Sequence, residues 1–199
     1  MTGNFKRGYP AKTPGWALLS SAGFTMIEML MVLAIISIAF GTIYKSFEQL
    51  NRSTATENVK AGAQQAVRIA VDFMVQDIRL AGLNPLGSPG IGIQAATPES
   101  IQFTMDANFD GDDEDTFENI TYGFNSGNGT LVQTNHLGDE VLIDNITSLN
   151  FTYLDSDDQT TSDLDEIRSV IVSLTMQRPA GRDPDISRTY TTRVRCRNL

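Results

Sequence analysis

Oxygen-bearing side chains recur at alternate positions in one short segment of the chain. The segment DANFDGD begins at Asp106 and carries acid or amide side chains at positions 1, 3, 5 and 7, with glycine at position 6. This is the spacing of the first half of an EF-hand-like calcium loop, in which alternate side chains converge on one hard cation. The candidate calcium ligands are Asp106, Asn108, Asp110, Asp112 and Glu118.

The second half of this segment departs from the calcium pattern. Position 12, where such loops carry a glutamate, is Phe117, and the glutamate comes one residue later. A solvated acidic loop between two strands is therefore the alternative interpretation. We expect that the protein requires no cofactor, and Ca²⁺ is the candidate ligand.

A single carboxylate interrupts a long apolar run near the N-terminus. Residues 24–44 include 16 apolar residues among 21, and Glu28 is their one charged residue. A charge at the centre of a bilayer costs roughly 2.5 to 3.5 kcal/mol on insertion scales, and less near the interface, so Glu28 is a functional candidate. The alternative is an interfacial glutamate near the start of a signal anchor.

Other kinds of catalytic or metal centre find little support in the sequence. One cysteine, Cys196, excludes a disulfide framework and a cysteine-based zinc cage, and one histidine, His136, excludes a multi-histidine centre. No Gly-x-Ser-x-Gly segment is present to expose a serine nucleophile. The acidic residues within 155–166 read as a solvated loop, and His136 as the end of a hairpin. We therefore predict that the protein is not an enzyme.

The charge of the chain is distributed unevenly. Residues 1–84 carry 8 Lys and Arg against 5 Asp and Glu, whereas residues 85–199 carry 7 against 19, for a total of −9. An acidic protein without a clustered basic surface is a poor binder of phosphate backbones, so we expect no nucleic-acid partner. The two parts of the chain are expected to have different electrostatic roles.

The first 44 residues have the pattern of a basic leader followed by a membrane span. Residues 1–23 contain three cations, no acid and two prolines, and the apolar run 24–44 is long enough to cross a hydrocarbon layer roughly 30 Å thick. The positive-inside rule places the N-terminus in the cytoplasm. An ordinary secretory signal peptide fits less well, because its apolar region is shorter and ends in a small-x-small cleavage site.

The polar segment that follows continues the helix. Apolar residues recur at three- and four-residue spacing through residues 45–83, which predicts an amphipathic helix with one face to bury. Gly82 and Pro85 provide the stop, so one helix is predicted over 25–81.

The remainder of the chain, residues 84–199, has the alternation of β-strands. The turn Ser126-Gly127-Asn128-Gly129 joins two alternating segments as a hairpin. We predict an α+β fold in which a mostly antiparallel sheet covers the apolar stripe of the helix. The late strands carry arginine and are expected to lie beside acidic neighbours. The predicted strands are 100–105, 118–125, 130–135, 140–146, 148–154, 167–177 and 188–197.

The hexapeptide GFTMIE, Gly23 to Glu28, resembles the processing and methylation motif of type IV prepilins and type II secretion pseudopilins. The resemblance implies a pilin-like fold, with cleavage of the leader after Gly23 by a prepilin peptidase that methylates the new N-terminus at Phe24. It also implies that Thr25 and Glu28 serve assembly, with Glu28 meeting the N-terminal ammonium of an adjacent subunit. Within one chain, that ammonium lies about one helical turn from Glu28.

Two further segments resemble W-type minor pilins of type IV pili and, more distantly, J-type pseudopilins of type II secretion. They are DIRLAGLNP at residues 77–85 and the C-terminal run that ends in RVRCRNL. Cys196 departs from this pattern; a buried or free thiol and a bond between chains are the two readings of it.

The resemblance implies a minor pilin of the bacterial inner membrane with a periplasmic head, which later enters a pilus (fimbrium) or a periplasmic filament. The implied partners are the prepilin peptidase, the major pilin, other minor pilins, the inner-membrane assembly platform and, before assembly, membrane lipid. A minor pseudopilin of a type II secretion system is the nearest alternative. An anchored periplasmic binding module or enzyme is the alternative from another class.

Overall fold

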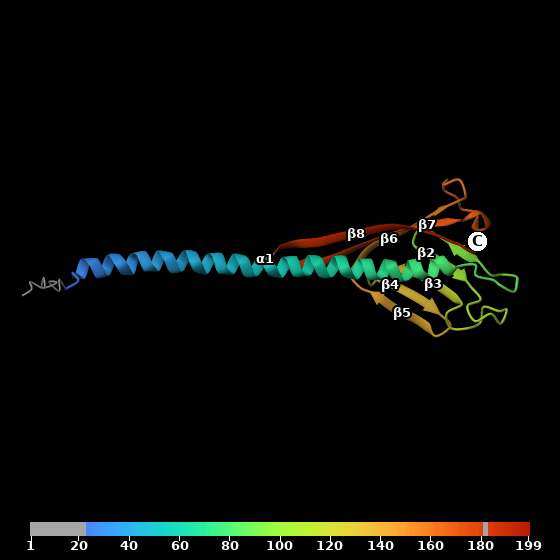
Figure 1. Cartoon of the computed structure of the whole chain (residues 1–199), viewed down its shortest axis with the longest axis horizontal. Helices are drawn as coiled ribbons and strands as arrows, with labels where there is room; N and C mark the ends of the chain where they lie inside the picture. Colours follow the sequence, from blue (N-terminus) through green and yellow to red (C-terminus); the bar gives the residue numbers. More distant parts are fainter. Residues whose placement is uncertain (1–22, 181–182) are drawn as a thin grey trace, which may run out of the picture. The chain divides into compact units, whose positions relative to one another are not determined.

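The computed structural model describes residues 23–180 and 183–199 of the chain. These residues form one long helix, two antiparallel sheets and a 3-10 turn, η1 (Leu164–Glu166) (Figure 1). By their internal contacts they belong to two compact units, one ending at Glu48 and the other running from Gln49 to Leu199. The predicted α+β class, with a long N-terminal helix against antiparallel sheet, is confirmed.

The helix α1 (Met26–Leu80) has 55 residues and contains no proline. Its end lies one residue before the predicted one, at a sharp turn where Gly82 has a φ of 77°. Only glycine fits there, because a Cβ atom would strain this backbone and would come within 2.3 Å of the Leu199 side chain. The C-terminus of the chain therefore covers the end of the helix, and the Asn198 amide also donates to the Leu80 carbonyl at 3.4 Å.

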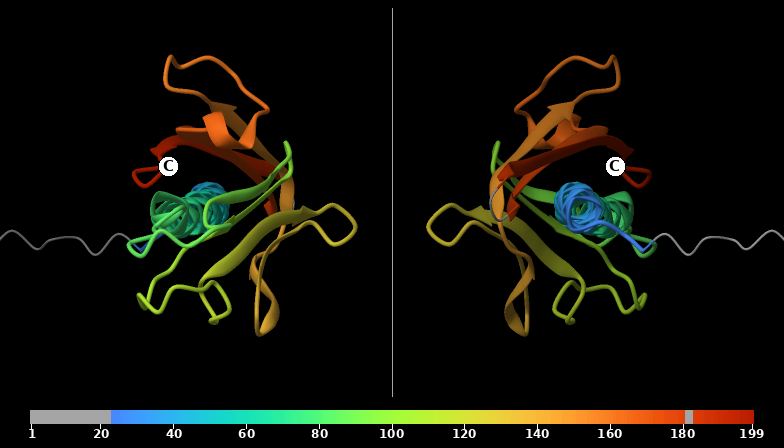
Figure 2. Two further views of the ribbon diagram at one scale, coloured as in Figure 1. Left: turned by 90° about the vertical axis from the view of Figure 1, so that its right-hand side faces the viewer. Right: turned by 90° about the vertical axis from the view of Figure 1, so that its left-hand side faces the viewer.

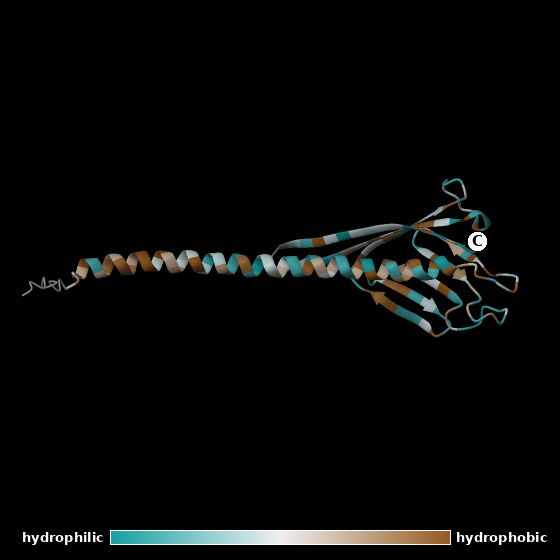
Figure 3. Ribbon diagram, viewed as in Figure 1, coloured by the Kyte–Doolittle hydropathy of each residue, from teal (hydrophilic) through white to brown (hydrophobic). Residues whose placement is uncertain are grey.

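The two parts of α1 differ in how their side chains are covered. Every residue from Met26 to Leu50 is exposed, and most of the large ones are apolar, shown in brown in Figure 3. By length and composition this part of α1 is a candidate membrane span. The later part carries a buried stripe at helical spacing, as the sequence predicted. The stripe consists of Ala63, Val67, Ala70, Val71, Met74 and Ile78.

The first sheet contains five strands in the order of the sequence. They are β1 (Ile93–Ala96), β2 (Ser100–Thr104), β3 (Asn119–Asn125), β4 (Thr130–Asn135) and β5 (Gly138–Ile143), each antiparallel to the next. The hairpin predicted at Ser126-Gly127-Asn128-Gly129 is confirmed as the connection between β3 and β4. β1 and β5 are the edges of this sheet.

The second sheet has the order β6-β7-β8. Its strands are β6 (Ile146–Leu154), β7 (Ser169–Ala180) and β8 (Asp183–Arg195), again antiparallel. Residues 140–146, predicted as one strand, are instead divided between the two sheets. Asn145 breaks the strand because it has a φ of 59°, which β-strands do not tolerate and asparagine adopts more readily than most residues.

The sequence did not reveal β1. This strand has only four residues, two of them alanine, and it lies among glycines and a proline that favour a loop. Pairing with β2 makes it a strand, an example of tertiary context overriding weak local preference. β8 likewise begins five residues earlier than predicted, because it pairs with β7 from Ala180 and Asp183 onward.

The two sheets cover one side of the later part of α1, which Figure 2 shows almost end on. The buried stripe of the helix packs with Ile101, Phe103 and Ile120 of the first sheet and with Val172 and Leu174 of the second. Burial of each large aliphatic side chain contributes about 1.5 to 3 kcal/mol, so this shared core holds the helix and both sheets together.

One polar contact crosses the core between helix and sheet. The hydroxyl of Tyr122, a fully buried residue on β3, donates to the carboxylate of Asp77 on α1. Desolvation raises the pKa of Asp77 above its ordinary value of 3.8, and the Tyr122 hydrogen bond acts in the opposite direction. The hydroxyl therefore compensates for part of the cost of placing a carboxylate beside the core.

We expect Tyr122→Phe to destabilise the full-length protein in detergent by about 2 kcal/mol at pH 7, the usual size of a hydrogen bond to a charged group. Without the hydroxyl, the pKa of Asp77 rises further, so protonation of Asp77 stabilises the fold more. The loss measured by denaturant unfolding should therefore shrink as the pH falls and Asp77 is protonated. In an Asp77→Asn background Tyr122→Phe should cost less; an equal cost in both backgrounds would contradict this contact.

Candidate functional site at the start of the helix

Gly23, Phe24 and Thr25 lie outside the regular helix, which begins at Met26. Phe24 is 78% exposed, and no atom lies within 4 Å of the space that a Cβ on Gly23 would occupy. As far as the described residues show, the peptide bond between Gly23 and Phe24 lies outside regular structure and is exposed. A protease cleft can approach such a bond closely, since glycine places no side chain in its way. The remainder of the predicted leader, residues 1–22, lies outside the described residues.

Thr25 and Glu28 form a reciprocal pair at the helix start. The Glu28 backbone N–H donates to Oγ1 of Thr25 at 3.3 Å, and the Thr25 N–H donates to Oε2 of Glu28 at 3.4 Å. This is a capping box, in which two side chains satisfy backbone donors that the first turn leaves free. Both residues are candidates from the sequence; the contact between them was not predicted, although the Thr-x-x-Glu spacing is the signal for it.

Both bonds of the capping box are long and exposed to the surroundings. The hydrogen bond between the Glu28 carboxylate and the Thr25 N–H is therefore weak. A cationic group placed beside Glu28 would form a shorter, charge-assisted bond and could displace the Thr25 N–H. The geometry leaves the carboxylate available to a neighbouring positive charge.

The acidic segment predicted to bind calcium forms a closed loop between β2 and β3. Asp106 is fully buried, and its two carboxylate oxygens accept the backbone N–H groups of Asp110 and Gly111, each at 3.2 Å. Glu118, 2% exposed, accepts the N–H groups of Ala107 and Asn108 through Oε1 at 2.9 and 3.2 Å. These two buried carboxylates fix the shape of the loop.

Three of the five candidate ligands come together in this loop. Carboxylate oxygens of Asp110, Asp112 and Glu118 lie within 4.8 Å of one another. Asn108 instead turns its amide nitrogen towards Asp110 and Asp115, at 2.8 and 2.6 Å. The oxygen set is chemically suited to a hard cation, because a carboxylate oxygen that accepts one N–H retains a further lone pair.

The second acidic segment forms local turns. Asp155 accepts the N–H groups of Asp157 and Gln159, and Asp163 caps η1 by accepting the N–H of Asp165. Asp158 forms an ion pair with Arg193 of β8, which holds the pKa of Asp158 below its ordinary value. The predicted acidic neighbour of a late strand is therefore confirmed for Arg193.

The two single-copy residues have different surroundings. His136 is exposed, and its Nε2 lies 3.1 Å from the Asp113 carbonyl oxygen. Cys196 is a free, buried thiol, which agrees with the buried reading of this residue. Burial raises the pKa of Cys196 to about 11, and the charge of Arg168 acts in the opposite direction.

Three features are now in place: an exposed glycine junction, a glutamate in the first turn of an exposed apolar helix, and a head of two sheets. This combination is that of a prepilin-type protein. The prokaryotic N-terminal methylation motif matches residues 18–44, and the model of prepilin peptidase-dependent protein B matches residues 58–196. The chain belongs to the prepilin peptidase-dependent protein B family. No curated protein matches the chain.

Family membership settles the function at a coarse level. The protein is of the pilin or pseudopilin type and is anchored in a membrane, and the prepilin peptidase is its partner. Such families are in general structural rather than enzymatic.

We expect Cys196 to be poorly reactive in the native protein. A pKa two units above its reference value of 9.0 lowers the thiolate fraction about 100-fold at neutral pH, and burial slows access further. Because the folded pKa is raised, the stability contributed by the neutral thiol should be lost as the pH rises from 9 towards 11. Maleimide labelling at pH 7.5, located by peptide mass spectrometry, measures the reactivity.

The matched control is Ser187→Cys, an exposed position on β8, the strand that ends one residue before Cys196. Residue 187 should label rapidly in the same sample in which Cys196 stays unlabelled until denaturant is added. Equal labelling at both positions, or a disulfide-linked dimer formed through Cys196, would contradict the buried thiol.

Proposed function

We propose that the protein is a minor subunit of a type IV pilus, which is cleaved, N-methylated and then incorporated into the filament or used to prime its assembly. The observation that carries the proposal is the junction of Gly23 to Glu28 at the head of a helix segment whose side chains are all exposed. Such a segment needs an apolar environment outside its own chain. A bilayer and a filament core both supply one.

Cleavage between Gly23 and Phe24 changes the chemistry of the helix start. It creates an N-terminal ammonium at Phe24 beside the exposed Glu28 carboxylate. In a filament, the ammonium of an adjacent subunit replaces the long Thr25 N–H contact of Glu28 with a charge-assisted bond. Because that pairing has one axial position, it sets the register of neighbouring subunits.

The same proposal includes a topology and further partners. The cations of the leader keep the N-terminus in the cytoplasm of a bacterial inner membrane, and the acidic head lies in the periplasm. Loss of residues 1–23 removes Lys6, Arg7 and Lys12 and changes the formal charge from −9 to −12. The further partners are the major pilin, other minor pilins, the assembly platform and, before assembly, lipid.

Two alternatives make different predictions. A minor pseudopilin of a type II secretion system shares the processed helix, but its deletion would block protein export and leave surface pili intact. A signal-anchored binding module or enzyme would keep its N-terminal segment or lose it at another site.

The mature protein should begin with N-methylated Phe24 when its intact mass is measured from membranes. Glu28→Ala should be processed normally but should enter filaments about tenfold less, since a charge-assisted bond contributes roughly 1.5 to 3 kcal/mol. Sheared filaments, probed for the subunit, give this yield. Glu48→Ala, another exposed acid on the same helix, is the control and should assemble normally.

An intact Met1 or Thr2 start would defeat the whole proposal. Normal assembly of Glu28→Ala would remove only the role of Glu28 in register. The two results are separable because processing and incorporation are measured independently.

We propose separately that the loop from Asp106 to Glu118 binds Ca²⁺. The convergence of Asp110, Asp112 and Glu118 supports this site, and the two buried carboxylates preorganise the loop around it. Asp106 and Asn108 would complete the shell through their side-chain oxygens. A bound cation would offset the mutual repulsion of the carboxylates and so stabilise the head.

Calcium at about ten times its dissociation constant should raise the melting temperature of the full-length protein by about 3 to 5 °C. Asp110→Asn combined with Asp112→Asn should abolish the shift, whereas Glu114→Gln, an exposed acid of the same loop, should retain it. Calorimetry without calcium heat, or an equal shift with Na⁺ at matched ionic strength, would leave the loop as a solvated acidic segment.

A further inference from the structure

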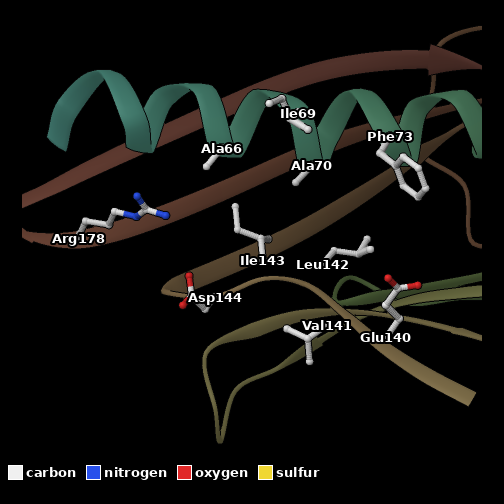
Figure 4. Close-up of a pocket in the computed structure, with 10 residues that line it drawn as sticks. All are labelled: Ala66, Ile69, Ala70, Phe73, Glu140, Val141, Leu142, Ile143, Asp144 and Arg178. Carbon is white, nitrogen blue, oxygen red and sulfur yellow. The ribbon is translucent and has the colours of Figure 1, made fainter. Parts of the chain in front are cut away.

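A groove of about 630 Å³ lies between α1 and β5 within the unit of residues 49–199 (Figure 4). One wall is a helix face made by Ala66, Ile69, Ala70 and Phe73. The other wall is the segment from Glu140 to Asp144 at β5, and Arg178 of β7 lies at one end.

The groove exposes apolar side chains that the core does not use. Ile69 is 60% exposed, Phe73 46% and Val141 59%, whereas the core-facing stripe of the same helix is buried. Ala66 and Ala70 also line the groove, and their small side chains leave space beside Phe73. Apolar surface gathered in a groove, as opposed to scattered singly, is typical of a binding surface.

The wall formed by β5 is also an unpaired sheet edge. β5 is the last strand of the first sheet and pairs only with β4. Among the described residues, no backbone hydrogen bond joins the other edge of β5 to a second element. A free edge beside an apolar groove is the arrangement that accepts an added strand, with main-chain bonds on one side and side-chain contacts on the other.

The charges along this edge select the strand that can bind. β5 and the residue after it carry Asp139, Glu140 and Asp144 and no cation. A second β5 added in parallel and in register would place acid beside acid, which disfavours that mode of self-pairing. Arg178 lies towards the Asp144 end, whereas at the Glu140 end the described lining residues include no cation (Figure 4). A fitting strand therefore carries Lys or Arg at the Glu140 end.

We propose that this groove binds an extended segment of another filament subunit, which adds as a strand to β5. The segment is apolar on the side that faces Ala66, Ala70 and Phe73 and carries a cation that pairs with Glu140. The bound segment has about the length of β5, which has six residues and spans about 20 Å. The proposal rests on the proposed function, because it supposes that the chain is surrounded by other filament subunits.

Photo-crosslinking in the producing cells tests the proposal with the full-length protein. Benzoylphenylalanine is placed at Val141 in one strain and at Ile143 in another, and the adducts are mapped by peptide mass spectrometry. Both positions should capture the same processed filament subunit, through a segment that contains Lys or Arg. In strand addition, the linked partner residues should be displaced by about two positions between the strains, because facing residues advance in step.

Two lysine variants test whether the partner segment pairs a cation with Glu140. Glu140→Lys should lower the adduct yield about fivefold by replacing an attraction with a repulsion. Glu114→Lys makes the same charge change at another exposed site and should leave the yield unchanged. Protection of Cys196 from maleimide shows that each variant is folded.

The crosslinking results can contradict either the strand addition or the proposed function. Linked partner residues spaced by three or four positions would indicate a helix in the groove and overturn strand addition. Absence of an adduct, an adduct with a protein that is not a filament subunit, or equal yields for both lysine variants would also overturn it. The N-terminal mass is measured in the same samples, so unprocessed protein would count against the proposed function, and processed protein without the adduct against the groove alone.

Discussion

The rest of the molecule depends on how the apolar surface of α1 is removed from water. Burial of apolar area contributes about 25 cal/mol per Å², so a helix rich in aliphatic residues requires cover along its length. From residue 63 onward, the two sheets of the same chain provide that cover on one face. From Met26 to Leu50, the described part of the chain provides none. Lipid, or the helices of other subunits, must do so.

This difference explains why the charged groups lie where they do. The one acid in the uncovered apolar run, Glu28, sits in the first turn of α1, where helix N–H groups lower the cost of its charge. Its capping contact is satisfied locally but weakly. A carboxylate held in this way is free to pair with a cation placed beside it.

The head packs around the same helix and leaves apolar side chains and one sheet edge exposed. Two antiparallel sheets, not one, enclose the core face of α1, and Tyr122 ties the first of them to Asp77. The core buries the stripe of α1 but leaves Ile69 and Phe73 exposed beside the open edge of β5. The acidic residues on that edge disfavour in-register parallel pairing between identical strands.

The sequence by itself determined the long helix, its apolar and amphipathic parts, the junction at Gly23 and Phe24, and the hairpin between β3 and β4. Each of these depends on periodicity or turn chemistry within a few residues. Tertiary structure alone decided the division into two sheets, because the positive φ of Asn145 matters only through the strands on either side. It also made a strand of Ile93–Ala96, which pairs with β2 despite a weak local preference. The same holds for the Tyr122–Asp77 contact and the groove beside β5, since both join residues more than 40 positions apart, a distance over which local sequence pattern carries no information.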